Sequence, residues 1–449
     1  MGRLFGSDGV RGVANAGLTC ENVMNIGRAA AAMLAADGRR VQVAVGWDTR
    51  ASSEMLAAAL TAGLCSVGAD VQLLGVVPTP AVAYFTRVHE ADLGVAVAAS
   101  HTPCEYNGLK LFDRAGRLSA ADEARIEAIL LDGAGEIPCP VGGEVGRVST
   151  VSRGAEEYLW YLASTAADLR GMRVAVDGAN GAACEAMAQL LADLGATPIR
   201  LNCEPNGKNI NASCGVAQVN GLADYVKAHK CFGGIALDGD GERCVAVDEK
   251  GNRLDGDRLL AAFALDRKEK GALKDRAVVT TPLANLGFFR FCETHGMAVH
   301  TVEVGGAIPE EAARVGAVLG GDSTGALVLR EFSPVADGLL TAVQLLTLCR
   351  EKGCKLSAVG EQMPRSPQVM LTVKADDRAK AAYMADKTLA AHIASVNASL
   401  GGEGRVTVRP SETEPLIRVM VEGREFHEIN HVAVALAATI KQAIGAYAL

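Results

Sequence analysis

A short apolar strand, a glycine-containing turn and an amphipathic helix recur along this chain. The pattern of hydrophobic and polar positions predicts this unit at 41–45 with 53–67, at 173–176 with 182–194, and at 277–280 with 285–293. Repeated strand–helix units favour α/β domains with mixed, mostly parallel sheets. In such folds, ligands bind near the carboxyl ends of the strands.

Interruptions of this pattern predict four domains. They lie near 149–153, 252–257 and 362–367, and they divide the chain into 1–152, 153–253, 254–365 and 366–449. In the last part the order changes to a strand at 368–373, a long alanine-rich helix, and strands at 405–408 and 417–421. We expect a smaller α+β domain there, closing over the rest.

Length and charge exclude several classes of function. The chain has 449 residues, too many for one core, and 44 Lys and Arg against 52 Asp and Glu give a net charge of −8. A nucleic-acid partner is not expected, because no basic stripe is present. The uncharged runs 55–69 and 71–85 are split by Asp70, so neither predicts a membrane span. Since the chain begins without an apolar signal core, we expect a cytoplasmic protein.

The segment from Asp238 to Arg243 carries the strongest chemical pattern. Asp238, Asp240 and Glu242 alternate with glycines between strands predicted at 234–237 and 244–247. The glycines allow a turn tight enough for the carboxylates to converge, and Mg²⁺ prefers such oxygen ligands. A hairpin loop, an EF-hand and an aspartyl phosphatase nucleophile are the alternatives. The third carboxylate and the adjoining cation of Arg243, which suits a phosphate, favour a metal site.

A second candidate site follows the strand predicted at 93–97. Ser100, next to His101, stands at the end of this strand, where an exposed hydroxyl can act as a nucleophile. The alternative is a helix-capping or turn serine. Lys110 can supply a cation or a proton, although a solvated surface lysine is the commoner case.

Three more loops combine glycines, hydroxyls and charges. Segment 5–12 places Arg11 on a glycine loop, and segment 320–325 is either a hairpin turn or a contact for sugar hydroxyls. Segment 409–415 combines an arginine with two hydroxyls, a composition that suits phosphate oxygens.

Together and in this order, the segments resemble the α-D-phosphohexomutase family over the whole chain, and within it the bacterial phosphoglucosamine mutases most closely. The resemblance rests on segments 5–12, 99–103, 238–243, 320–325 and 409–415. In addition, Asn209-Ile210-Asn211, followed by Cys214-Gly215, is similar to a stretch typical of the phosphoglucosamine branch. The resemblance implies three similar α/β domains and a smaller C-terminal α+β domain around a central cleft.

The resemblance also implies a reaction. Ser100 would carry a phosphoryl group, and one Mg²⁺ per chain would be held by Ser100, Asp238, Asp240 and Glu242. Glucosamine 6-phosphate and glucosamine 1-phosphate would interconvert through a hexose 1,6-bisphosphate, which also serves as activator. The implied catalytic residues are Ser100, His101, Lys110, Arg11 and Arg243, and the implied substrate-binding residues are Asp322, Thr324, Arg409, Ser411 and Thr413. The chain is expected to be a monomer or a homodimer.

Several positions depart from the family pattern. Glu242 stands where Asp is usual, Glu412 occupies a position often held by Gly, and an expected charged pair near 304–307 is missing. In the sugar loop the usual Glu, Ser and His are replaced by Asp322, Thr324 and Ala326. Loss of a general base removes about 10²–10⁴-fold in rate, so that Lys110 would carry more of the proton transfer or turnover would be slow. These departures leave two alternatives open: a glucose or mannose phosphate as substrate, or a sugar-phosphate-binding protein with weakened turnover.

Overall fold

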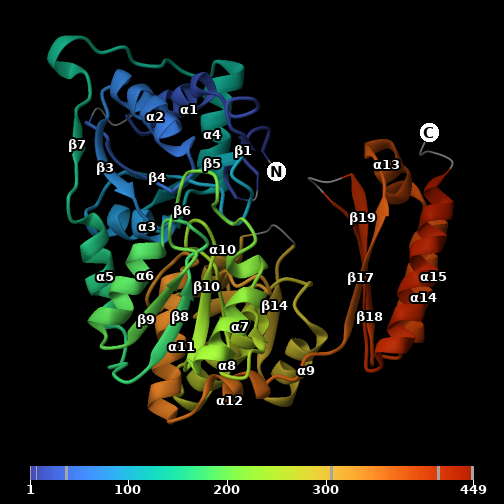
Figure 1. Cartoon of the computed structure of the whole chain (residues 1–449). Coiled ribbons are helices and arrows are strands. Elements are labelled where there is room, and N and C mark those ends of the chain that lie inside the picture. Colours follow the sequence, from blue (N-terminus) through green and yellow to red (C-terminus); the bar gives the residue numbers. More distant parts are fainter. Residues whose placement is uncertain (1, 7, 36–38, 304–306, 412–414, 446–449) are drawn as a thin grey trace. The chain divides into compact units, whose positions relative to one another are not determined.

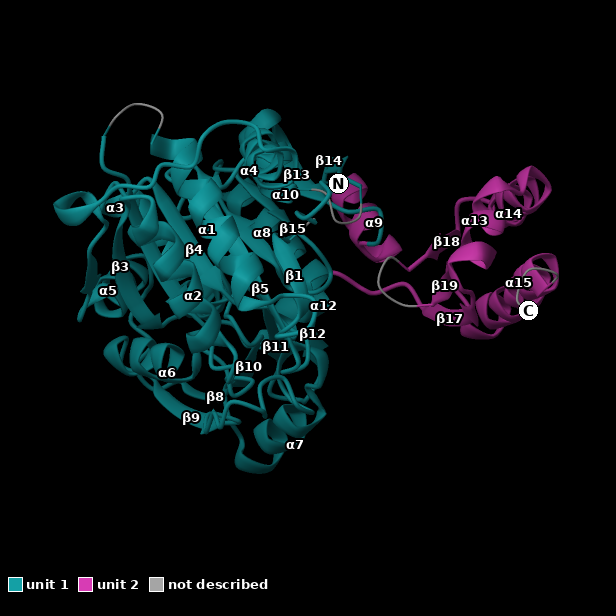
Figure 2. Ribbon diagram, turned by 90° about the horizontal axis from the view of Figure 1, so that it is seen from above, with its two compact units in different colours: residues 1–283, 295–362 teal, residues 284–294, 363–449 magenta. Residues whose placement is uncertain are grey.

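The computed structural model describes residues 2–6, 8–35, 39–303, 307–411 and 415–445, which fall into two compact units. Unit 1 comprises residues 1–283 and 295–362, and unit 2 comprises residues 284–294 and 363–449 (Figure 2). In the described part of the chain, unit 1 contains three mixed sheets and unit 2 contains one antiparallel sheet (Figure 1).

The first sheet of unit 1 combines a parallel centre with an antiparallel edge. Its described strands are β1 (Val10–Val13), β2 (Gln42–Trp47), β3 (Asp70–Val76), β4 (Leu93–Val97), β5 (Tyr106–Asp113), β6 (Gly116–Arg117) and β7 (Val148–Thr150). Strand β2 pairs in parallel with β3 and β4, β3 pairs in parallel with β7, and β5 is antiparallel to β1, β4 and β6.

Helices cover both faces of this sheet, because successive strand residues point to opposite sides. Large side chains such as Val43, Val45 and Leu93 pack against α1 (Cys20–Leu34), α2 (Ser53–Ser66) and α4 (Ala120–Asp132). Small residues face α3 (Thr79–Val88), and a Cβ added at Gly94 would lie 2.0 Å from Oγ1 of Thr86. The close approach of α3 therefore requires glycine at this position.

The second sheet contains the strands predicted around the carboxylate-rich turn. It comprises β8 (Arg173–Asp177), β9 (Thr197–Leu201), β10 (Gly233–Leu237), β11 (Cys244–Val247) and β12 (Arg253–Leu254), with α5 (Gly154–Ser164), α6 (Cys184–Asp193) and α7 (Asn220–His229). Strand β8 is parallel to β9 and β10, whereas β11 is antiparallel to β10 and β12. The predicted strands at 234–237 and 244–247 are confirmed.

The third sheet repeats this mixture. It comprises β13 (Ala277–Thr280), β14 (Ala298–Thr301), β15 (Leu319–Gly321) and β16 (Leu327–Leu329), with α8 (Gly256–Glu269), α10 (Ile308–Arg314), α11 (Gly338–Lys352) and α12 (Leu356–Glu361). Strand β13 is parallel to β14 and β15, and β16 is antiparallel to β15. Helix α11 is buried from residue 338 to 349 and contacts elements of the second and third sheets, which holds them together.

Unit 2 is an antiparallel sheet covered by helices. It comprises α9 (Leu286–Thr294), β17 (Gln368–Lys374), α13 (Asp377–Ala385), α14 (Lys387–Ser399), β18 (Arg405–Pro410), β19 (Leu416–Glu422) and α15 (Phe426–Gly445). Strand β19 lies between β17 and β18, and α15 packs on the sheet through Ile429, Leu436 and Ile440.

The prediction of one long alanine-rich helix in this unit is wrong. Helices α13 and α14 are separated at Asp386, whose backbone is extended and whose carboxylate accepts hydrogen bonds from the amides of Thr388 and Leu389 at 2.9 Å each. A capping carboxylate starts a new helix and competes with continuation of the preceding one. The alanine content alone concealed this break.

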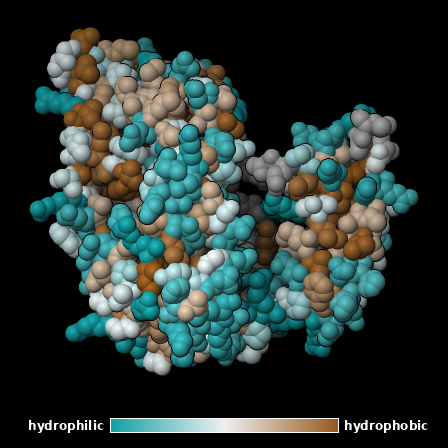
Figure 3. All heavy atoms as spheres, viewed as in Figure 1, coloured by the Kyte–Doolittle hydropathy of each residue, from teal (hydrophilic) through white to brown (hydrophobic). Residues whose placement is uncertain are grey.

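The observed sheets confirm the predicted α/β class with a smaller C-terminal α+β part. The four domain boundaries and the arrangement around a central cleft stay predictions. On the face seen in Figure 3, hydrophobic residues form small patches within a mostly hydrophilic surface. Among the described residues, none of the helices has both the length and the apolar composition needed to cross a bilayer.

Candidate active site

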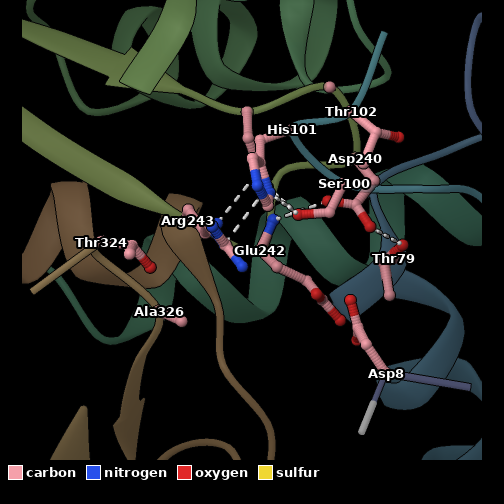
Figure 4. A network of polar contacts seen from close by, with 12 residues as sticks. Asp8, Thr79, Ser100, His101, Thr102, Asp240, Glu242, Arg243, Thr324 and Ala326 are labelled. Carbon is pink, nitrogen blue, oxygen red and sulfur yellow. Dashed lines mark hydrogen bonds and ion pairs between the residues drawn. The ribbon is translucent and has the colours of Figure 1, made fainter. Parts of the chain in front are cut away.

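The loop after β4 brings Ser100 against the turn between β10 and β11. We call residues 99–103 the serine loop and residues 238–243 the carboxylate loop. Ser100 has a φ of +51°, a region that residues other than glycine rarely adopt, and it is buried. Its Oγ donates to Oδ2 of Asp238 at 2.6 Å. The same Oγ lies 3.3 Å from Nδ1 of His101 (Figure 4). Two segments that the sequence predicted to meet are therefore in direct contact.

Arg50 holds the serine loop in this shape. Its buried guanidinium donates to the carbonyl oxygens of Ser100 at 3.2 Å and Thr102 at 2.9 Å, and it also contacts the carbonyl of Pro103. The Nε of Arg50 donates to Oδ2 of Asp48 at 2.8 Å. Sequence reasoning missed both residues, although they lie three and five residues after the strand predicted at 41–45, at the end where ligand-binding loops are expected.

The carboxylates of the carboxylate loop have different partners. Asp238 accepts hydrogen bonds from the hydroxyl of Ser100 and, within the loop, from the backbone amide of Arg243 at 2.9 Å. Asp240 and Glu242 both accept from Nζ of Lys110, at 2.6 Å in the case of Asp240. In the described part of the chain, no three His, Cys, Asp or Glu side chains form a group arranged to hold a metal.

Charge and burial nevertheless make this loop suited to a hard cation. Burial, together with the neighbouring charge of Asp240, raises the pKa of Asp238. Burial also raises the pKa of Glu242. Both shifts mean that negative charge is costly here, and a divalent cation would offset that cost with the oxygen donors present. The donor set of Asp238, Asp240, Glu242 and Ser100 is chemically consistent with Mg²⁺.

Lys110 is a buried cation. Burial lowers its pKa, but the charges of Asp240, Asp8 and Glu242 outweigh that effect and leave the pKa above its ordinary value. A lysine in this state stabilises negative charge and can donate a proton, but it cannot accept one. Of the two expected roles, a cation or a proton donor, the raised pKa favours the cation, because it makes the ammonium group a weaker acid.

Asp8 is a site residue that the sequence prediction missed. It is ion-paired with Arg11, and its Oδ1 lies 3.7 Å from Nζ of Lys110 and 3.7 Å from Nη1 of Arg117. Burial raises the pKa of Asp8, but Lys110, Arg11 and Arg117 bring it below the ordinary value, so that the carboxylate stays charged. The glycine loop at 5–12 was the available signal, and only its arginine was considered.

His101 differs from these charged groups. Burial of its ring, with the nearby charges of Arg243 and Arg11, lowers its pKa below the ordinary value. The imidazole is therefore neutral near pH 7, and a neutral imidazole can accept a proton through one ring nitrogen.

The 320–325 turn is joined to the carboxylate loop through the backbone. Arg243 and Ala326 form an antiparallel bridge, and the amide of Cys244 donates to the carbonyl of Gly325 at 2.9 Å. Oδ1 of Asp322 accepts from the amide and the hydroxyl of Thr324, at 2.9 and 2.6 Å. The two predicted sugar-binding side chains therefore bond to one another.

A cavity of about 200 Å³ adjoins this turn within unit 1. Its polar lining includes Asp8, Arg117, Glu242, Arg243 and Asp322. Its apolar lining includes Phe112, Ile308, Ala326 and Val328. The carboxylate loop and the 320–325 turn thus border a space of the size of a small organic molecule.

The predicted phosphate loop belongs to unit 2. Arg409 lies near the end of β18, and Ser411 is buried with its amide donating to the carbonyl of Leu416 at 2.9 Å. Thr413 and Glu412 lie outside the described residues, as do residues 304–306. The contribution of Arg409, Ser411 and Thr413 to substrate binding stays a prediction.

Sequence comparison identifies the family of this protein, a group of isomerases. The sequence matches four descriptions of one family: "Phosphoglucomutase/phosphomannomutase", alpha/beta/alpha domain I over residues 2–134, domain II over 156–251, domain III over 255–366 and the C-terminal domain over 370–439. The chain belongs to the phosphoglucomutase/phosphomannomutase family. The resemblance inferred from the motifs is confirmed.

Similar proteins span nearly the whole chain. The sequence is 45% identical over 439 residues to a phosphoglucosamine mutase of Moorella thermoacetica, covering 97% of this chain and 98% of that protein. It is 41% identical over 445 residues to a phosphoglucosamine mutase of Clostridium novyi, covering 98% and 99%. A phosphoglucomutase/phosphomannomutase family protein from Burkholderia thailandensis has a similar fold, with a TM-score of 0.82 at 22% identity over 98% of this chain and 97% of that one.

Proposed function

We propose that this protein is a phosphoglucosamine mutase that interconverts glucosamine 6-phosphate and glucosamine 1-phosphate. The observation that carries the proposal is the contact between Ser100 Oγ and Asp238, with Lys110 bound to the next two carboxylates of the same loop. Two relatives of that name, 45% and 41% identical to this chain over nearly its full length, support this choice of sugar.

In the proposed reaction Ser100 carries the phosphoryl group. The P–O bond to Ser100 Oγ breaks as a hydroxyl oxygen of the sugar monophosphate forms a new one, giving a hexose 1,6-bisphosphate. After the bisphosphate turns around, its other phosphoryl group returns to Ser100 and releases the isomer. Such transfers depend on positioning and on stabilisation of charge rather than on further covalent chemistry.

The side chains divide this work according to their charge. Lys110 and Arg243, both cations, stabilise the negative oxygens of the transferring group. The neutral ring of His101 lies 3.3 Å from Ser100 Oγ and is the group in position to accept the proton of the attacking hydroxyl. Asp238, Asp240 and Glu242, with Ser100, would hold the Mg²⁺ that the family resemblance implies. When it is bound, this ion neutralises phosphate charge.

The test is a mutase assay with added hexose 1,6-bisphosphate. We expect the wild-type protein to convert glucosamine 1-phosphate faster than glucose or mannose 1-phosphate, and Ser100→Ala to lose turnover. Ser66→Ala, a serine in α2 whose hydroxyl donates to the carbonyl of Gly63, serves as the matched control. Equal turnover by wild type and Ser100→Ala would eliminate the serine as phosphoryl carrier.

A second candidate keeps the mechanism and changes the sugar to glucose or mannose phosphate. The internal hydrogen bonds of Asp322 and Thr324 favour it, because oxygens used within the turn recognise a particular ring hydroxyl less well. The ratio of kcat/KM among the three sugar phosphates separates the two candidates.

A third candidate is a sugar-phosphate-binding homologue with weakened turnover. It is favoured by Ala326, which lines the cavity and has no side chain that can transfer a proton. Binding of a sugar phosphate in calorimetry without turnover in the assay would select it.

A further inference from the structure

Asn211 connects the serine loop to the carboxylate loop with the two ends of a single amide. Its Nδ2 donates to the carbonyl oxygen of Ser100 at 2.9 Å and to that of Thr102 at 3.0 Å. Its Oδ1 accepts from the amide of Gly239 at 3.0 Å. Asn211 thus contacts the backbone of Ser100 itself and the residue next to Asp238.

The fold fixes the side chain of Asn211 in this place. Asn211 has a φ of +58°, a left-handed conformation that asparagine adopts more readily than most residues, and its amide donates to the carbonyl of Ala179 at 2.9 Å. A Cβ added at Gly239 would lie 2.8 Å from Nδ2 of Asn211 and 2.6 Å from Cδ1 of Ile210. The glycine therefore leaves room for the amide to lie directly on the carboxylate loop.

Other contacts hold each loop, but they act differently. Arg50 donates to the same two carbonyl oxygens, and it comes from the first sheet, to which the serine loop also belongs. Thr79 bonds to Asp240 through its amide and its hydroxyl, at 2.8 and 2.9 Å, and does not involve the serine loop. Asn211 joins the two loops at the residues that flank the contact between Ser100 Oγ and Asp238.

We propose that Asn211 is a positioning residue that sets the distance between the Ser100 hydroxyl and the Asp238 carboxylate for phosphoryl transfer. The inference rests on the proposed function, because it assigns Asn211 a part in that reaction. A change in this distance alters the alignment of the reacting oxygen, and misplacement by about 1 Å costs on the order of 10²-fold in rate. Neither Ser100 nor Asp238 lines the cavity, so we expect a change in this distance to affect kcat more than KM.

The first test compares two asparagines of the same short motif. Asn211→Asp keeps the size and the acceptor oxygen but turns a second oxygen toward two carbonyls. Asn209→Asp is the matched control, because Asn209 bonds to Glu204 and Asn206 within its own loop. We expect Asn211→Asp to lower kcat by about 10–100-fold, the range found for outer-shell partners of active groups, with KM changed less than about threefold. Asn209→Asp is expected to stay within about twofold of wild type in both constants.

The second test measures the hydrogen bonds of Asn211 to the two loops without relying on enzyme activity. Hydrogen–deuterium exchange reports the amide of Gly239, which loses its acceptor in Asn211→Ala. We expect faster exchange in peptides that cover residues 99–103 and 238–243, and no such change in Asn209→Ala. Where Asn211→Asp does not give folded protein, Gly239→Ala disturbs the same contact from the other loop and replaces it in the kinetic test.

The outcomes separate this inference from the proposed function. A wild-type protein that turns over none of the three sugar phosphates defeats the proposed function, while the exchange data still decide whether Asn211 holds the two loops. Unchanged kcat in Asn211→Asp, equal losses in the Asn209 control, or unchanged exchange in Asn211→Ala would overturn the role of Asn211.

Discussion

Asp337 begins the buried helix α11 and makes a quantitative prediction possible. Its Oδ1 accepts from the amide of Leu340 at 2.9 Å, and the hydroxyl of Tyr158 donates to its two oxygens at 2.8 and 2.9 Å. The next amide, of Gly338, donates to the carbonyl of Gly241 in the carboxylate loop at 2.9 Å. A change at Asp337 therefore acts on the helix that supports the candidate site.

Burial raises the pKa of Asp337 from 3.8 to about 6, against the hydrogen bonds from Leu340 and Tyr158. The folded state thus binds the proton more tightly than the unfolded chain does. The contribution of this proton to stability is fully present below pH 3.8 and is lost as the pH rises through 6. At about 1.4 kcal/mol per tenfold change in proton affinity, the carboxylate costs about 3 kcal/mol at pH 8.

Asp337→Asn removes the charge and keeps an oxygen for the helix cap and for Tyr158. We expect the variant and the wild type to have similar free energies of unfolding at pH 4. At pH 8 the variant is expected to be more stable, by up to about 3 kcal/mol, reduced by the weaker hydrogen bonds of a neutral acceptor. Urea unfolding of both proteins at several pH values, with the difference taken at each pH, measures the effect.

The control is Asp376→Asn, because Asp376 caps α13 through the amide of Ala379 and is exposed. Its difference from wild type is expected to stay within about 0.5 kcal/mol and to be the same at pH 4 and pH 8. If Asp337→Asn were less stable than wild type at pH 8, or if its difference did not vary with pH, the assignment of a buried, costly charge would be wrong.

Two further substitutions test the site's cations. Arg50→Lys keeps the positive charge, but a lysine cannot bond to Asp48 and to the serine-loop carbonyls at once. We therefore expect the free energy of unfolding, measured by thermal unfolding, to fall by about 3–5 kcal/mol. An unchanged melting temperature would contradict this. Lys110→Met leaves Asp240 and Glu242 without their cation. We therefore expect the variant to bind Mg²⁺ at least about tenfold more tightly, as measured by calorimetry, and its mutase turnover to fall. Weaker Mg²⁺ binding would contradict the pairing of Lys110 with these carboxylates.

Much of the fold was predictable from local pattern. Strands at 93–97, 244–247 and 277–280 coincide with the observed β4, β11 and β13, because buried strands of α/β domains are short continuous apolar runs. The alanine-rich part of unit 2 was not predictable in the same way. There the break depends on a single carboxylate, Asp386, and the composition on both sides favours a helix.

For the site, too, the sequence predicted some residues and not others. Ser100 and Asp238 each stand at the end of a predicted strand, and their contact follows from the meeting of such ends. Arg50, Asp8 and Asn211 also have partners far away in the sequence, at Ser100, Thr102 and Lys110, and nothing in their local pattern indicates those distant partners. The motif around Asn211 was noticed only as a resemblance, and its hydrogen bonds supply the physical reason for it.

The balance of charge near Ser100 explains why Asn211 and Arg50 hold the serine loop and the carboxylate loop in place. Four carboxylates and four cations, all buried or half-buried, lie together in this part of the site: the acids are Asp8, Asp238, Asp240 and Glu242, and the cations are Lys110, Arg11, Arg117 and Arg243. A phosphoryl group on Ser100 adds about −1.5 to −2 further charges at neutral pH. Without rigid support these groups would separate, since repulsion between buried charges falls with distance. The neutral amide of Asn211 and the guanidinium of Arg50 provide that support by bonding to backbone carbonyls, so that the carboxylates stay close enough together to act on one phosphoryl group.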